Sequence, residues 1–296
     1  MKTITSRDNA QYKDLVKLAG SAQARRKSGR TLLDGVHLCQ SYLQLRGAPE
    51  QCIVSETALH DPEVMDIVGR LQAQHAHVLG LPDALYHALS QVEHGVGVMF
   101  LIPTPERSVV GPLTVSAVLL DGVQDPGNVG SILRSAAAAG ITQVYCSAGT
   151  AFCWSPKVLR AAMGAHFVLD IFENVDLAAL VSGAQVASLA TSGYATQRLY
   201  DIDLRQPVAW LFGHEGQGVA HDLLALATHQ VVIPHLGQVE SLNVAACAVS
   251  PSGASVIWVA PTRCRISTIT RRCASSPSAI RKCNCPISIT APVETA

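Results

Sequence analysis

Three segments of the chain combine glycine with side chains that could do chemistry, and each follows a short apolar run. The first, DGVQDPGNVGSILRSAAAAG, places a glycine-rich turn before a helix-like stretch with one cation, Arg134. The second, LFGHEGQGV, sets Glu215 among three glycines, and the third, IPHLGQVESLNVAA, brings Ser241 and Asn243 after a turn. Glycine lets the backbone approach a ligand closely, and the free N–H groups of a helix start attract anions. These segments predict a ligand site with an anion-binding part beside Arg134.

Each segment alone also has a simpler interpretation. Glu215 could belong to a tight turn, and Ser241 at a helix start is the expected N-cap. The first segment lacks the Lys and Ser/Thr of GxxxxGK[ST] and does not match GxGxxG. The segment is therefore not the P-loop of a nucleoside triphosphatase. Without GxGxxG, a nicotinamide-dependent oxidoreductase lacks its main sequence signal.

The elements that position these segments alternate regularly from residue 114 onward. We expect strands at 115–121, 141–147, 167–172, 185–191, 207–213 and 230–234. We expect helices at 128–140, 155–166, 176–184, 218–227 and 241–249. Continuously apolar strands that alternate with short helices are typical of a mostly parallel sheet covered on both faces. Such sheets bind ligands at the carboxyl ends of their strands, so we expect the three segments to meet there.

A smaller α/β unit precedes this sheet. It contains a helix, a basic turn ARRKSGR and a second helix around VHLCQSYLQL. Apolar runs follow at 52–54, 77–81 and 96–102, with helical stretches at 62–74 and 82–91. The proline-rich stretch that follows has no periodicity and is typical of a linker. We therefore predict an amino-terminal domain at 1–103, a linker at 104–113, a larger domain at 114–250 and a tail at 251–296.

The charge of the chain is unevenly distributed. The chain has 22 basic and 22 acidic residues, which argues against a nucleic-acid partner, because phosphate binding depends on Lys and Arg. Residues 1–33, however, carry a net charge of +6, residues 34–250 carry −11 and residues 251–296 carry +5. This asymmetry is typical of a protein with one end that faces nucleic acid, although a solvated basic helix would give the same count.

The composition, 48% apolar and 15% charged, excludes a disordered or fibrous chain. The chain starts with the polar MKTITSRDNAQYKD, and no apolar run approaches the roughly 20 residues of a membrane helix. We expect a soluble cytoplasmic protein without a signal peptide, whose nine cysteines are reduced thiols. Cys264, Cys273, Cys283 and Cys285 fit no common zinc spacing, and we predict no metal.

The three segments, in this order and spacing, resemble the signature motifs of the SpoU (TrmH-like) class of RNA 2′-O-ribose methyltransferases in the SPOUT superfamily. The motifs correspond to NVGSILRSAAAAG, LFGHEGQGV and IPHLGQVESLNVAA. The segments ITSRDNAQYKDLVKLA and ARRKSGRTLLDGVHL resemble the small, ribosomal-protein-like substrate domain of this class, with Asp34 where Glu is usual. The resemblance implies a deep trefoil knot, a homodimer formed through the knotted domain, and S-adenosylmethionine as methyl donor. It implies ribosomal RNA rather than tRNA as the substrate.

The resemblance also implies roles for individual residues. Methyl transfer from a sulfonium is an in-line displacement, so the ribose hydroxyl must be aligned and its proton loss eased. Arg134 matches the catalytic arginine of the class, and we expect it to position and stabilise charge because a guanidinium keeps its proton. The other catalytic positions are Asn128, Glu215, Ser241 and Asn243. The cofactor positions are Leu211, Gly213, Ile233 and Leu242. The RNA-binding positions are Arg25, Arg26, Lys27 and Arg30.

The sequence departs from the class after Ala246. Pro251 and Gly253 interrupt the helix that begins near SLN, and proline inside a helix costs about 3 kcal/mol. The following CRISTITRRCASSPSAIRKCNCPISIT has no helical or strand period and resembles translation in another frame. We expect residues 251–296 to form an atypical, poorly packed tail. An alternative function follows, an RNA-binding or ribosome-assembly protein that keeps the fold with little or no turnover.

Overall fold

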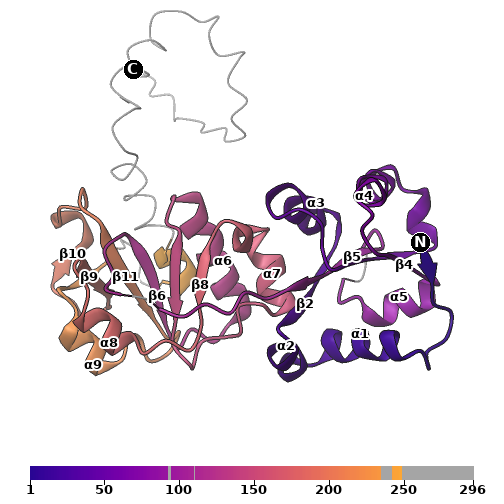
Figure 1. The fold of residues 1–296 in the computed structure, drawn as a ribbon. Helices are drawn as coiled ribbons and strands as arrows, with labels where there is room; N and C mark the ends of the chain where they lie inside the picture. The colour runs from indigo at the N-terminus through magenta and orange to yellow at the C-terminus, as the bar shows by residue number, and fades with distance from the viewer. Residues whose placement is uncertain (93–94, 110, 235–241, 249–296) are drawn as a thin grey trace, which may run out of the picture. The chain divides into compact units, whose positions relative to one another are not determined.

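The computed structural model describes residues 1–92, 95–109, 111–234 and 242–248 (Figure 1). Its strands form two sheets, one of five strands within residues 2–103 and one of seven strands within residues 117–232. Ser241 and the predicted tail lie outside the described residues. The two sheets contribute to one shared hydrophobic cluster, so the predicted domain boundaries stay a prediction.

The five-stranded sheet has the order β1-β4-β3-β5-β2. Its strands are β1 (Lys2–Thr3), β2 (Arg30–Asp34), β3 (Gln51–Ser55), β4 (Val78–Leu81) and β5 (Val98–Pro103). Its helices are α1 (Ala10–Gly20), α2 (Ala22–Ser28), α3 (Val36–Leu45), η1 (Thr57–His60), α4 (Pro62–Ala73) and α5 (Asp83–Leu89). Strands β1, β4 and β3 run parallel, whereas β5 runs antiparallel to β3 and β2. The amino-terminal part is thus a small mixed α/β unit.

The prediction of a turn at ARRKSGR is wrong. Ser21 caps helix α2 by accepting a hydrogen bond from the Ala24 N–H, and Gly29 ends the helix in the left-handed region at φ 60°. Strand β2 then begins at Arg30 and pairs with β5. The consecutive charges of RRK hide this helix, because they give no apolar periodicity.

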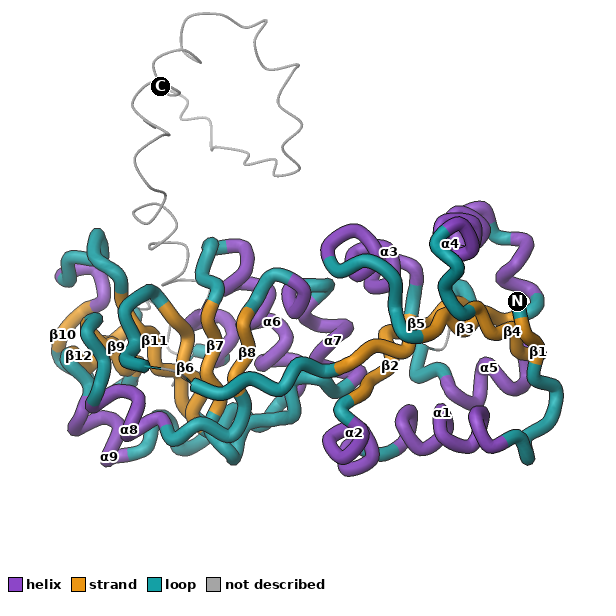
Figure 2. Tube along the Cα trace, viewed as in Figure 1, coloured by secondary structure: helices purple, strands orange, loops and turns teal. Residues whose placement is uncertain are grey.

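The strands of the seven-stranded sheet lie in the order β10-β12-β9-β11-β6-β7-β8 (Figure 2). Every adjacent pair is parallel. Its strands are β6 (Ala117–Asp121), β7 (Gln143–Cys146), β8 (Asp170–Phe172), β9 (Ala187–Thr191), β10 (Gln197–Arg198), β11 (Val208–Gly213) and β12 (His229–Val232). Its helices are α6 (Pro126–Ala138), α7 (Pro156–Ala162), η2 (Ala165–Phe167), α8 (Leu177–Ser182), η3 (Leu199–Asp201) and α9 (His221–Leu226). The predicted parallel α/β fold is confirmed.

One predicted strand begins later than expected, and one observed strand was not predicted. The strand expected at 167–172 begins only at Asp170, because Met163 and Gly164 adopt positive φ and start the short helix η2. Strand β10 has no prediction, since Gln197 and Arg198 are polar and only two residues long. It exists because it pairs with β12 at the end of the sheet.

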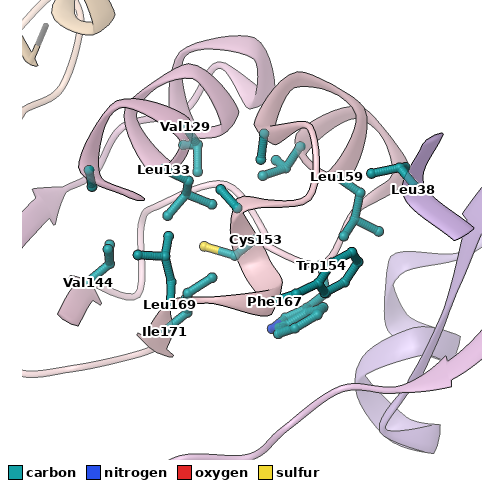
Figure 3. Packing of buried hydrophobic residues seen from close by; sticks show 14 of the residues in the cluster. Leu38, Val129, Leu133, Val144, Cys153, Trp154, Leu159, Phe167, Leu169 and Ile171 are labelled. Carbon is teal, nitrogen blue, oxygen red and sulfur yellow. The ribbon is translucent and has the colours of Figure 1, made fainter. Parts of the chain in front are cut away.

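Alternate side chains of the central strands point to opposite faces of the sheet and belong to two hydrophobic clusters. Val118 and Leu120 of β6 join a cluster with helices α6 and α7, whereas Leu119 joins a cluster with α8 and α9. Figure 3 shows side chains of α6 and α7 directed toward the region around Cys153. Gly130 permits this packing, because a Cβ there would lie 2.4 Å from the Cβ of Ala161. The seven-stranded sheet is thus covered by hydrophobic packing on both faces.

Within the described ranges, the helices are too short or too polar to cross a lipid bilayer.

Candidate active site

The first loop of the site links β6 to α6 and is fastened at both ends. Asp125 caps α6 by accepting a hydrogen bond from the Asn128 N–H at 2.8 Å, and Pro126 occupies the first turn, where its missing N–H costs nothing. At the other end Gly122 adopts φ 68° and donates its N–H to the Ser147 hydroxyl at 2.9 Å. The Thr150 hydroxyl donates to the Leu120 carbonyl, also at 2.9 Å. The loop therefore has one defined path.

Glu215 fastens this loop to the second one. Its carboxylate accepts the backbone N–H of Gln124 at 3.1 Å and of Asp125 at 3.0 Å, and the side-chain amide of Asn128 at 3.0 Å. Burial raises the pKa of the Glu215 carboxyl, but hydrogen bonds from Asn128 and two backbone groups outweigh it and lower the pKa to about 2. Glu215 is therefore ionised at neutral pH and acts as an acceptor.

Asn128 joins Glu215 to the third segment. While its Nδ2 donates to Glu215, its Oδ1 accepts from Nδ2 of Asn243 at 3.0 Å. The Asn243 Oδ1 in turn accepts the Ala245 N–H at 2.8 Å, at the start of the helical turn 244–248. Both ends of the Asn128 amide are thus used, which fixes its orientation. The prediction that the three segments meet at one edge holds for these three residues.

The second loop, residues 214–220, follows β11 and closes on itself. The backbones of His214 and Gly218 exchange two hydrogen bonds of 3.0 and 2.8 Å. A Cβ at Gly213 would lie 2.1 Å from the backbone of Gly218 and Val219, so only glycine fits there. At the far end the Ala220 N–H donates to the Asp121 carboxylate at 2.9 Å. Asp121 and Glu215 therefore clamp the two loops from opposite sides.

Arg134 lies on α6 with an exposed side chain. Within the described part of the chain it makes no hydrogen bond or ion pair, with Asn128, Glu215 and Asn243 included. Its guanidinium is available to a ligand.

The predicted cofactor positions lie along the same edge, with one difference. Gly213 ends β11, Ile233 directly follows β12, and Leu242 is half-buried against the hydrophobic cluster of α6 and α7. Leu211 is fully buried in the layer of α8 and α9, and its carbonyl accepts the Thr191 hydroxyl at 3.1 Å. Its side chain therefore packs in the core, and a cofactor contact of Leu211, which stays a prediction, would involve its backbone.

The four basic residues predicted to bind RNA occupy different environments. Arg25 is buried, and its guanidinium donates to the carbonyls of Leu18 and Ala19 at the end of α1. Arg26 lies over the ring of Phe152 at 4.6 Å, and Lys27 is exposed. The remaining residue, Arg30, is ion-paired with Asp14 at 2.9 Å. Arg25 is a structural residue, and the other three stay candidates for RNA contact.

Sequence reasoning missed two residues of the site. Asp121 is the last residue of β6 and the first residue of the first segment, and its position at the end of a strand was the only signal. His214 stands between two predicted site residues, Gly213 and Glu215, but a single histidine in a loop gives no sequence signal of its role. The described residues contain no group of three or more His, Cys, Asp or Glu side chains that could hold a metal ion.

The fold and the site define a parallel α/β domain that binds its ligand on glycine-rich loops at the carboxyl edge of the sheet. Comparison with known proteins identifies the family. Residues 116–250 match the model of the SpoU rRNA Methylase family. The chain belongs to this family, as its similarity to whole relatives also shows.

One relative is an uncharacterized tRNA/rRNA methyltransferase of Synechocystis, 35% identical over 249 residues, which cover 82% of this chain and 89% of the relative. Another is the 23S rRNA (guanosine(2553)-2′-O)-methyltransferase RlmP of Bacillus subtilis, 31% identical over 252 residues, with 84% and 96% covered. The AdoMet-bound rRNA methyltransferase of Sinorhizobium meliloti has a similar structure, with a TM-score of 0.75, 25% identity, and 86% and 97% covered. The predicted family is confirmed. The knot depends on the path of residues 235–241 and beyond, outside the described residues, and stays a prediction.

Proposed function

We propose that this chain transfers a methyl group from S-adenosylmethionine to a ribose 2′-hydroxyl of structured RNA, and that this RNA is ribosomal. The hydrogen-bonded chain Asn243–Asn128–Glu215 supports the proposal, because it fixes polar groups from three motifs at the edge where such sheets bind ligands. The relative RlmP, named as a methyltransferase of a guanosine 2′-oxygen in 23S rRNA, supports ribosomal RNA over tRNA.

The residues at this edge fit the methyl donor. Gly213 ends β11 without a side chain, and the half-buried Leu242 offers apolar surface of the kind that an adenine ring needs. Ile233 is buried directly after β12, so its contact would come through its backbone. S-adenosylmethionine, when bound there, supplies a methyl group on a positively charged sulfur. Gly213, Ile233 and Leu242 would hold it through backbone and apolar contacts.

The side chains of the site suit the acceptor. Transfer would form a bond from the 2′-oxygen to the methyl carbon, release the sulfur as the neutral thioether S-adenosylhomocysteine, and pass the hydroxyl proton to water. The free Arg134 guanidinium can hold a neighbouring phosphate and stabilise the negative charge that develops on the 2′-oxygen. Glu215, ionised and fully engaged with donors, and Asn128, fixed at both ends, keep the loops in place. Ser241, which lies outside the described residues, remains a proposed member of the site.

RNA contact is proposed for Arg26, Lys27 and Arg30 on and after α2. Lys27 is exposed, and the guanidinium of Arg26 lies over the ring of Phe152. An arginine fixed on an aromatic face loses little side-chain entropy when it meets phosphate. We also propose a homodimer formed through the larger domain, which the molar mass from light scattering would test.

Two measurements test the function. Calorimetric titration with S-adenosylhomocysteine measures cofactor binding, and transfer of labelled methyl groups to ribosomal RNA measures activity. We expect Arg134→Ala to bind S-adenosylhomocysteine within about twofold of the unaltered protein and to lose 10²–10³-fold in transfer rate. Arg205→Ala, which removes an exposed arginine paired with Asp203, is the matched control and should keep both. Binding without transfer by the unaltered protein, with no change on Arg134→Ala, would favour the assembly function.

A further inference from the structure

His214 occupies the turn between a proposed cofactor residue, Gly213, and the clamping residue Glu215. Its imidazole Nδ1 accepts the backbone N–H of Gly216 at 2.9 Å and of Gln217 at 3.3 Å. An imidazole nitrogen accepts hydrogen bonds only while it is unprotonated. The ring is therefore neutral in this structure, with its hydrogen on Nε2.

The loop is folded around this ring. The His214 and Gly218 backbones pair with each other, which closes residues 214–218 into one turn, and Gly218 completes it at φ 73°. The N–H groups of Gly216 and Gln217 point inward to Nδ1. The imidazole thus takes the part that a backbone carbonyl plays in an ordinary turn, and it holds the backbone of Gly216 and Gln217 in place.

We propose that neutral His214 is a positioning residue for cofactor binding, and that its protonation loosens loop 214–218 and weakens the binding. The inference rests on the proposed function. Histidine ordinarily titrates between about pH 5 and 8. A protonated Nδ1 would face two N–H donors, so the loop must change its path.

Three carboxylates belong to the segments that carry or contact the loop of His214. Glu215 lies next to it, Asp121 holds the end of the same loop at Ala220, and Asp125 starts α6 opposite. All three carboxylates already accept backbone N–H groups. The contacts that a proton on Nδ1 would break are therefore the two N–H groups of Gly216 and Gln217.

Two substitutions separate the acceptor from the proton. The Oδ1 of His214→Asn can accept N–H groups two and three residues ahead and does not titrate, whereas His214→Ala removes the acceptor. The dissociation constant of S-adenosylhomocysteine is measured by calorimetry from pH 8.0 to 5.5. We expect the unaltered protein to weaken about tenfold over this range, as two lost hydrogen bonds imply, and His214→Asn to stay nearly constant. His214→Ala should be about tenfold weaker at every pH.

A second histidine serves as the control, and three results would contradict the inference. His221→Asn changes an exposed histidine at the start of α9 and should follow the unaltered protein. A parallel loss of affinity in the unaltered protein and His214→Asn overturns the inference, and so does unaltered binding by His214→Ala at pH 8.0. The ¹⁵N shifts of the His214 ring in the ligand-free protein report the tautomer separately. A hydrogen on Nδ1 would refute the inference, whereas absent binding at pH 8.0 with the expected tautomer would refute the proposed function.

Discussion

Replacing Glu215 with glutamine tests whether its charge holds the two loops together. The carboxylate accepts three donors at 3.0 to 3.1 Å, whereas a glutamine would turn its own Nε2 toward one of them. The lowering of the Glu215 pKa from 4.5 to about 2 corresponds at full value to about 3.4 kcal/mol. Because the side chain is exposed, solvent screening reduces this to about 1 kcal/mol. We expect Glu215→Gln to lower the free energy of unfolding by that amount at pH 7.

The stabilisation by the Glu215 carboxylate should depend on pH in one direction. A carboxyl whose pKa is lowered by folding stabilises the protein above its unfolded pKa of 4.5, and this contribution is lost as the pH falls toward 2. The difference between the unaltered protein and Glu215→Gln should therefore shrink below pH 4.5.

Urea unfolding followed by tryptophan fluorescence at pH 7, 5, 4 and 3.5 measures this difference. Glu106→Gln, which changes an exposed carboxyl, is the matched control and should show no difference at any of these values. A gap for Glu215→Gln that stays constant from pH 5 to 3.5, or is absent at pH 7, would refute the clamp.

Three further changes have expected outcomes. Gly130→Ala places a Cβ 2.4 Å from the Cβ of Ala161 and 2.7 Å from the Val158 carbonyl, and should lower the free energy of urea unfolding by about 1–3 kcal/mol. Asp125→Ala and Asp176→Ala each remove a helix N-cap worth about 1 kcal/mol, so both should lower the thermal midpoint, but only Asp125→Ala should weaken S-adenosylhomocysteine in calorimetry. Burial lowers the pKa of His166 to about 4, so its neutral form stabilises the protein above pH 6.5 and this contribution is lost as the pH falls through 4. Urea unfolding across this window should show that slope, and His166→Gln should flatten it; an unchanged slope would assign it to other groups.

The sequence predicts much of the larger domain because its apolar strands are continuous and its turns contain glycine. That alternation predicts that the three segments meet at one edge, the resemblance to the family points to Asn128, Glu215 and Asn243 within them, and the structure joins these residues. Arg25 shows the limit, because its burial depends on the angle between α1 and α2, which brings it to the carbonyls at the end of α1.

Leu211 and His214 show the same limit in the second motif. Leu211 points into the core because side chains alternate along β11, and the face that each one takes depends on the register of the sheet. His214 accepts two N–H groups only because the loop closes at Gly218. Neither feature has a local signature.

The hydrogen bond between Asn128 and Asn243 joins residues 115 positions apart in the chain, which has a consequence for folding during synthesis. A ribosome adds about 5–20 residues each second, so Asn128 is made roughly 6–23 s before its partner. During that interval the first loop can fold on Ser147 and later on Glu215, while one end of the Asn128 amide still meets water. The nascent chain therefore completes its site only as the last motif leaves the ribosome, long after the basic amino-terminal part has been exposed to RNA.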